Sequence, residues 1–254
     1  MDHALGRKDR TLDRGRRVDL RSLNYSVLPL GTVDSTLIPL LRSANLRFDD
    51  TVLDQGSEGS CVGHGSAHAL MSDPIAHSWL DHPLAYRIYE GARRRDEWAG
   101  EDYEGTSVLG GCQYLKDARM IEKYLWCLSA VQVAFMIGVK RRAVIMGCDW
   151  YNGMWDTDAN GFIHPTGGIV GGHCVDVDEC RVAWLDRSQP HDNANFDWLN
   201  TYVGGPNSWG PDWGVGGRWK MSLIDFAKLV PGGDFAVLYG EKRASTPDNI
   251  IATR

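Results

Sequence analysis

Residues 205–214 read GPNSWGPDWG, a stretch in which an asparagine precedes two tryptophans that are each followed by glycine. The side-chain oxygen of Asn207 can accept the N–H of an imidazole ring and so fix the tautomer and orientation of a histidine. The indole of Trp209 can cover such a hydrogen bond and exclude water from it. A loop that only packs glycine and tryptophan does not require asparagine at this place. The stretch therefore predicts a histidine partner elsewhere in the chain.

A cysteine at the start of a predicted helix lies far upstream. Residues 54–61 read DQGSEGSC, and the apolar residues over 61–71 have near-helical spacing, which predicts a helix that begins near Cys61. A thiol at a helix N-terminus feels the positive end of the helix dipole, which favours the thiolate. A backbone N–H of this turn and the side-chain NH₂ of Gln55 can both donate to an oxyanion. From this segment alone, a buried structural cysteine after a flexible loop has equal weight.

His173 follows two glycines at the start of a β-prone segment. The glycines leave its ring approachable at an edge where a thiolate from another part of the fold can meet it. Strand alternation sends Cys174 to the opposite face, which predicts that Cys174 belongs to the core. A single histidine in a sequence is usually structural or exposed to solvent. His173 is a candidate site residue only because Cys61 and Asn207 are also present.

Helical patterns dominate the first half of the chain and strand patterns the second. Helices are predicted over residues 61–71 and 83–98, and a third runs from a cap at Thr106 or Ser107 to Met120. Residues 18–53 read as extended, with at most short strands. Strands are predicted over residues 131–137, 143–146, 172–177, 181–185, 217–222 and 235–239. This order predicts an α+β fold with two subdomains that meet at a cleft.

These segments together resemble the papain-like cysteine peptidases. The resemblance rests on Gln55-Gly56-Ser57 followed by Gly59-Ser60-Cys61, on Gly172-His173, and on Asn207-Ser208-Trp209-Gly210 continuing into Trp213-Gly214. Their order, Gln, Cys, His, Asn, is the family's order. His173 and Asn207 follow Cys61 by roughly 110 and 150 residues, against about 130–150 in the family, so the histidine comes somewhat early.

The resemblance implies a role for each of these residues. Cys61 is the expected nucleophile, His173 the base and Asn207 the residue that orients the base. Gln55 and the backbone N–H of Cys61 are the expected oxyanion donors, and Trp209 is the expected shield of the site. The implied reaction is hydrolysis of peptide bonds in a polypeptide substrate through a thioester acyl-enzyme, with no cofactor and no metal.

The resemblance also implies a two-lobed architecture with the active site between the lobes. The peptidase domain is expected over residues 18–254, with a helical lobe over about residues 55–125 and a β-barrel-like lobe over about 130–240. Residues 1–17 are predicted to form a flexible basic arm that can contact a protein partner.

The chain departs from the secreted members of the family near the nucleophile. Glu58 stands where they have a cysteine three residues before it, so that disulfide cannot form, and Val62 replaces the usual aromatic residue after it. Residues 1–54 are too short for their long helical inhibitory propeptide. The compact form is closer to propeptide-less versions from bacteria and their tailed phages.

Composition excludes several other classes of protein. The chain has 27 Lys and Arg against 33 Asp and Glu, and this net charge of −6 argues against a general nucleic-acid-binding protein. The charged N-terminus lacks the apolar region of a signal peptide, and no segment approaches the roughly 18 apolar residues that span a bilayer. A cytoplasmic protein is therefore expected, or a virion-associated one if a phage encodes it. The six cysteines contain no CxxC pair, which argues against a zinc ribbon.

Two further segments have weaker signals. Residues 156–161, DTDANG, match the first half of a calcium loop, but Gly167 stands at the twelfth position, where a bidentate glutamate is expected. A tight turn is favoured there, and calcium binding stays open. His64, three residues after Cys61, is predicted to pack or to lie at the rim of the site rather than to act in catalysis.

Two other functions remain open from the sequence. Cysteine and histidine chemistry serves a hydrolase of peptidoglycan peptides equally well. The chain can also be a catalytically silent structural or binding component of a phage virion or another assembly. Retention of Cys61, His173, Asn207 and Gln55 together argues against the second alternative.

Overall fold

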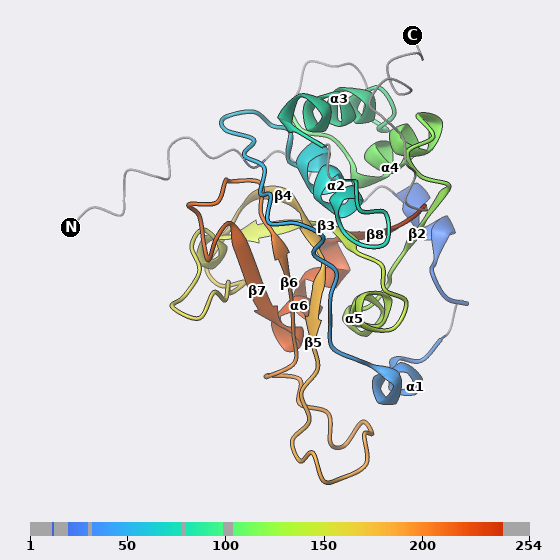
Figure 1. The fold of residues 1–254 in the computed structure, drawn as a ribbon, viewed down its shortest axis with the longest axis vertical. Coiled ribbons are helices and arrows are strands. Elements are labelled where there is room, and N and C mark those ends of the chain that lie inside the picture. Colours follow the sequence, from blue (N-terminus) through green and yellow to red (C-terminus); the bar gives the residue numbers. More distant parts are fainter. Residues whose placement is uncertain (1–11, 13–19, 30–31, 78–79, 99–103, 241–254) are drawn as a thin grey trace, which may run out of the picture.

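The computed structural model describes residues 12, 20–29, 32–77, 80–98 and 104–240. Figure 1 shows helices α2, α3 and α4 gathered at one end of the molecule and strands β5, β6 and β7 towards the other. Apart from Leu12, the predicted basic arm lies outside the described residues. Within these ranges, no helix has both the length and the apolar character that a membrane span requires.

Three helices form the first part of the fold: α2 (Cys61–Met71), α3 (His82–Arg93) and α4 (Val108–Asp117). They confirm the three predicted helices, although α3 ends five residues earlier than predicted. Side chains cap two of them, because Asp81 accepts from the backbone N–H of Leu84 and Ser107 accepts from that of Gly110. Every residue of α2 is buried, since α3 packs on it from one side and β4 from another.

Small residues allow α2 to pack this closely. A Cβ atom added at Gly63 would lie 2.1 Å from the carbonyl oxygen of Ala85 in α3. A Cβ added at Gly65 would lie 3.2 Å from the sulfur of Cys174 in β4. The helix that begins at Cys61 is therefore wedged between α3 and β4 with little free space.

Two antiparallel four-stranded sheets, with strand orders β2-β8-β3-β4 and β1-β5-β6-β7, form the second part. Only Asp178 separates β4 from β5, so one residue carries the chain from the first sheet to the second. The strands are β1 (Ala44–Asn45), β2 (Lys123–Trp126), β3 (Val144–Tyr151), β4 (Ile169–Val177), β5 (Glu179–Arg181), β6 (Tyr202–Pro206), β7 (Arg218–Ser222) and β8 (Asp234–Tyr239).

The prediction of a strand over residues 131–137 is wrong. These residues lie in helix α5 (Ala130–Gly138), which begins where the side chain of Ser129 accepts from the backbone N–H of Gln132. All nine residues of α5 are buried, so its apolar run has no polar face and shows no helical period.

A second helix, α6 (Leu223–Leu229), has no counterpart in the prediction. It directly follows β7 and begins at the cap residue Ser222.

The other predicted strands have mixed outcomes. Residues 143–146, 172–177, 217–222 and 235–239 overlap β3, β4, β7 and β8, which confirms them. Of residues 181–185, only Arg181 lies in a strand. Residues 18–53 contain, besides β1, the short helices η1 (Leu20–Tyr25), α1 (Asp34–Leu37) and η2 (Ile38–Leu40). Two further short helices are η3 (Asn152–Met154) and η4 (Val230–Gly232).

The first sheet separates two hydrophobic cores. Val144 and Met146 of β3 pack in a core with α5 and α6, whereas Ile145 packs in the core of α2, α3 and α4. Cys174 of β4 also belongs to the helical core and is fully buried, which confirms that it packs away from the candidate site. The two cores therefore share strands β3, β4 and β8, each of which contributes residues to both.

Candidate active site

The structure brings His173 and Asn207 into direct contact. His173 lies on β4 and Asn207 directly follows β6, and both are fully buried. The Nε2 atom of His173 lies 2.8 Å from the Oδ1 atom of Asn207, which also accepts from the backbone N–H of Ser208 at 2.8 Å. Because Oδ1 only accepts, Nε2 carries the hydrogen, and in the neutral ring Nδ1 is then the basic atom. Within the described residues, Nδ1 has no hydrogen-bond partner.

Burial governs the electrostatics of His173. It lowers the pKa of the ring to about 4, the hydrogen bond with Asn207 acts in the opposite direction, and the charge of His64 lowers the pKa further. His64 of α2 therefore influences the protonation of the His173 ring on β4. An imidazolium at His173 therefore needs a compensating negative charge close by.

Aromatic side chains enclose the His173 ring. Trp209 stacks on it with centroids 4.8 Å apart, and Trp150 of β3 meets it edge-on at 4.7 Å. Trp155 stacks on the outer face of the cluster against Trp209 at 5.4 Å, and Trp213 meets Trp209 edge-on at 5.2 Å. Trp209 thus lies where a shield over the His173–Asn207 hydrogen bond is expected.

Cys61 is the first residue of α2 and is fully buried. Two contacts fix the direction in which α2 runs along β4: Gly65 lies against Cys174, and Ser72, at the end of the helix, donates to Asp176 Oδ2 at 3.2 Å. Helix and strand therefore run in the same general direction. Cys61, one turn before Gly65, lies towards the start of β4, the end where His173 is found.

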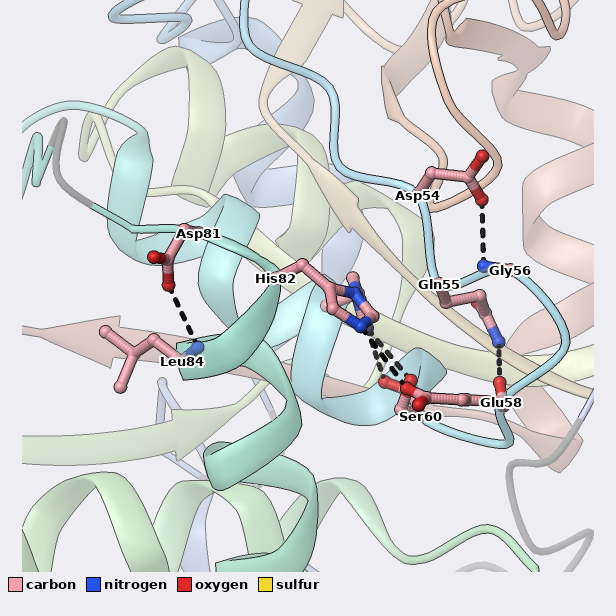
Figure 2. A network of polar contacts seen from close by, with 9 residues as sticks. Asp54, Gln55, Gly56, Glu58, Ser60, Asp81, His82 and Leu84 are labelled. Atoms are coloured by element: carbon pink, nitrogen blue, oxygen red, sulfur yellow. Dashed lines mark hydrogen bonds and ion pairs between the residues drawn. The ribbon is translucent and has the colours of Figure 1, made fainter.

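Gln55 is held by the segment that carries Asn207. Its backbone N–H donates to the carbonyl of Ser208 at 2.9 Å, and the hydroxyl of Ser208 donates to its Oε1. Its Nε2 donates to the carbonyl of Glu58 at 2.7 Å, a contact drawn in Figure 2. An antiparallel bridge between Asp54 and Trp209 joins the same two segments. The candidate oxyanion donor and the candidate orienting residue are therefore fixed to each other.

Trp150 and Ser208 are contacts that sequence reasoning missed. Trp150 packs in the core and also forms a wall of the His173 site. Its place depends on the register between β3 and β4, in which Cys148 pairs with His173. The local sequence around Trp150 does not indicate how β3 and β4 pair. For Ser208, the neighbouring Asn207 was the available signal.

Residues 156–161 form a tight turn, as favoured from the sequence. Oδ1 of Asp158 accepts from the backbone N–H groups of Asn160 and Phe162, at 2.8 and 2.9 Å, and Gly161 has a φ of +85°. These hydrogen bonds, with the one from Phe162 foremost, lower the pKa of the Asp158 carboxyl. Across the described part of the chain, no group of three or more His, Cys, Asp and Glu residues is placed to hold a metal ion.

Leu12 lies beside the candidate site. A Cβ atom added at Gly171 would lie 2.8 Å from the Cβ of Leu12. Gly171 precedes His173 by two residues on β4. The glycine therefore leaves room for Leu12 next to the histidine strand.

Solved structures of cysteine proteases share this architecture. Xylellain, a cysteine protease from Xylella fastidiosa, matches with a TM-score of 0.57 and 17% identity over 92% of this chain and 96% of that one. A digestive procathepsin L2 proteinase from Tenebrio molitor matches with 0.51 and 16% identity over 78% and 68%. A recombinant stem bromelain precursor matches with 0.50 and 15% identity over 88% and 77%.

By sequence alone, neither a protein-family profile nor a curated protein matches the chain. Identities of this size establish a shared fold and leave the activity to be argued from the site. The expected α+β architecture is confirmed, with helices in the N-terminal part and antiparallel sheets in the C-terminal part. The chain has the fold of the papain-like cysteine proteases.

Proposed function

We propose that the chain is a cysteine endopeptidase that hydrolyses peptide bonds with Cys61, His173 and Asn207. The observation that carries the proposal is the buried hydrogen bond between His173 Nε2 and Asn207 Oδ1, covered by Trp209. It lies on the strand along which the Cys61 helix packs. A structural histidine does not require its second nitrogen to remain unpaired, whereas a general base does.

The proposed first step is attack by Cys61 on a peptide carbonyl. The sulfur forms a bond to the carbonyl carbon, the carbonyl π electrons move to oxygen, and the thiol proton passes to Nδ1 of His173. The backbone N–H of Cys61 and the side-chain amide of Gln55 donate to the resulting oxyanion. The first N–H groups of a helix have no partner within the helix, which suits that of Cys61 to this role.

The second step releases the amine, and the third restores the enzyme. The C–N bond breaks as His173 gives its proton to the leaving nitrogen, and a thioester on Cys61 remains. Water then attacks the thioester while His173 accepts a proton from it, and the carboxylic acid product leaves. Asn207 keeps Nε2 protonated and the ring oriented throughout, so that only Nδ1 exchanges protons.

Burial couples the charges of Cys61 and His173. A lone imidazolium is disfavoured at His173, as its lowered pKa indicates, and a lone thiolate in a fully buried position is disfavoured for the same reason. Thiolate and imidazolium therefore form together, each offsetting the other's desolvation. The dipole at the start of α2 adds to the stabilisation of the thiolate.

Turnover of a denatured protein and of a peptide panel by purified Cys61→Ala tests the proposal. We expect complete loss of activity with an unchanged far-UV circular dichroism spectrum. Cys112→Ala is the matched control, because Cys112 is buried in α4 and burial raises its pKa, so its removal leaves turnover intact. Asn207→Ala should retain partial activity, reduced by about tenfold or more, which corresponds to about 1.4 kcal/mol.

Three results separate the proposal from its rivals. Near wild-type cleavage by Cys61→Ala contradicts the mechanism. A clearing zone on purified cell wall, with none on denatured protein, points instead to a peptidoglycan peptide hydrolase. A wild-type chain that cleaves neither substrate, and whose Cys61 resists iodoacetamide at pH 7, is a binding component.

A further inference from the structure

A chain of polar contacts leads from the protein surface to the start of the Cys61 helix. His82 Nε2 lies 3.4 Å from Glu58 Oε2, and His82 Nδ1 lies 2.9 Å from His64 Nε2. His64 Nδ1 in turn lies 3.0 Å from the carbonyl oxygen of Ser60, the residue before Cys61. Figure 2 shows His82 reaching from the start of α3 towards Ser60 and Glu58. These contacts join α3, α2 and the loop of residues 55–60, which we call the oxyanion loop.

The direction of each hydrogen bond follows from the Ser60 carbonyl, which can only accept. A hydrogen on His64 Nδ1 satisfies this carbonyl, and the hydroxyl of Ser60 lies 3.2 Å from the same nitrogen. Burial, the largest cause, lowers the pKa of His64 to about 4, so the ring is neutral and its Nε2 can only accept. His82 must then donate from Nδ1.

The remaining nitrogen of His82 faces a carboxylate. If His82 were neutral, its Nε2 would present a lone pair to the oxygen of Glu58, which is repulsive. A hydrogen on Nε2 turns the same contact into a charge-assisted hydrogen bond. A hydrogen on Nε2 of His82 therefore satisfies its contact with Glu58. The side chains of His82 and Glu58 are 43% and 46% exposed.

Glu58 connects this chain to Gln55. The Nε2 atom of Gln55 donates to the carbonyl of Glu58, and the backbone N–H of Glu58 donates to the carbonyl of Gln55 at 3.2 Å. The backbone of His82 is held in place, because the side chain of Asp81 caps the first turn of α3 by accepting from the backbone N–H of Leu84. A movement of Glu58 away from His82 therefore moves the amide assigned to the oxyanion.

We propose that His82 is a positioning residue that holds the oxyanion loop in its productive position through its contact with Glu58, an inference that rests on the proposed peptidase function. Loss of this contact releases Glu58, loosens the Gln55 amide and lowers kcat. An exposed histidine and glutamate pair adds little to stability, so the effect concerns the loop and not the fold.

The kcat and KM values of three variants test this proposal. His82→Gln should lower kcat about tenfold with little change in KM. His82→Arg places a fork of donors beside Glu58, so it should restore kcat. His191→Gln is the matched control, because His191 stacks on the distant Trp184. Glu58→Gln combined with His82→Gln should be no worse than either change alone.

Hydrogen exchange at residues 55–60 gives a second measurement that does not depend on turnover. His82→Gln should lose protection in this loop relative to the wild type, and His82→Arg should not. Identical kcat and identical exchange in wild type and His82→Gln overturn the proposal. If the wild type cleaves nothing, the proposed function fails, and the exchange data then decide alone whether His82 holds the loop.

Discussion

The indole of Trp209 lies across the imidazole of His173, with ring centroids 4.8 Å apart and ring planes inclined by 22°. The same ring is 5% exposed, so it separates the His173–Asn207 hydrogen bond from bulk water. A hydrogen bond from which water is excluded is stronger than an exposed one. Removal of the indole should therefore affect both the stability of the chain and the orientation of the histidine.

We predict that Trp209→Ala lowers the free energy of unfolding by about 3–5 kcal/mol and kcat/KM by more than tenfold. Trp209→Phe is the matched variant, since a smaller aromatic ring still covers the hydrogen bond. It should lose less stability and keep most of the activity. Urea unfolding followed by tryptophan fluorescence, together with kinetics on one peptide, measures both effects. Equal kcat/KM for Trp209→Ala and wild type would show that Trp209 shields nothing.

The close approach of α2 and α3 at Gly63 predicts a large stability effect from one methyl group. In Gly63→Ala the new Cβ meets the carbonyl oxygen of Ala85 at 2.1 Å, so the two helices must separate. Overpacking of this kind costs about 1–3 kcal/mol, which lowers Tm by roughly 2–4 °C for each kcal/mol in a chain of this size. Gly168→Ala is the control, because its Cβ meets only the side chain of Asn152 at 3.8 Å. A Tm difference of less than 1 °C between the variants contradicts the packing described here.

The carboxyl group of Asp176 predicts a pH dependence of stability. Burial, and then the charge of Asp178, raise its pKa well above the ordinary value for aspartate. The folded state therefore binds a proton that the unfolded state releases above about pH 4. Stability is lost as the pH rises from there towards the folded-state pKa, by about 1.4 kcal/mol for each pH unit. Asp176→Asn removes this loss, so its stability relative to the wild type should increase with pH.

Asp178→Asn is the matched control for that measurement. Asp178 forms an ion pair with Arg218, and both side chains are mostly buried. Removal of one partner from such a pair leaves an uncompensated charge and costs about 3–5 kcal/mol at neutral pH. Urea unfolding between pH 4 and pH 8 should show, at pH 7, a loss of stability for Asp178→Asn and none for Asp176→Asn. A stability difference between Asp176→Asn and wild type that does not change with pH would mean that Asp176 does not titrate on unfolding.

Much of the candidate site could be predicted because its residues lie in short local motifs. Cys61 follows a glycine-rich turn, His173 follows two glycines, and Asn207 begins a stretch with Trp209. The fold class followed from the same segments together with the change from helical to strand patterns along the chain. The roles of these residues in catalysis stay predictions until the variants are measured.

The parts that could not be predicted depend on contacts between distant segments. Helix α5 is buried on every side, so its sequence has no polar face from which to recognise a helix. Trp150 reaches His173 only through the pairing of β3 with β4. His82 reaches His64 only because Gly63 allows α3 to pack tightly on α2. In each case the tertiary contact, and not the local sequence, determines the role.

The pairing of residues 54 and 55 with residues 208 and 209 also has a consequence for synthesis of the protein. About 150 residues separate the two segments, and a ribosome adds about 5–20 residues per second, so the second segment follows the first by roughly 8–30 s. During that interval the nascent chain contains Cys61 and Gln55 but lacks the strand partner that holds Gln55. The candidate site is therefore assembled only after residues 207–209 have been synthesised.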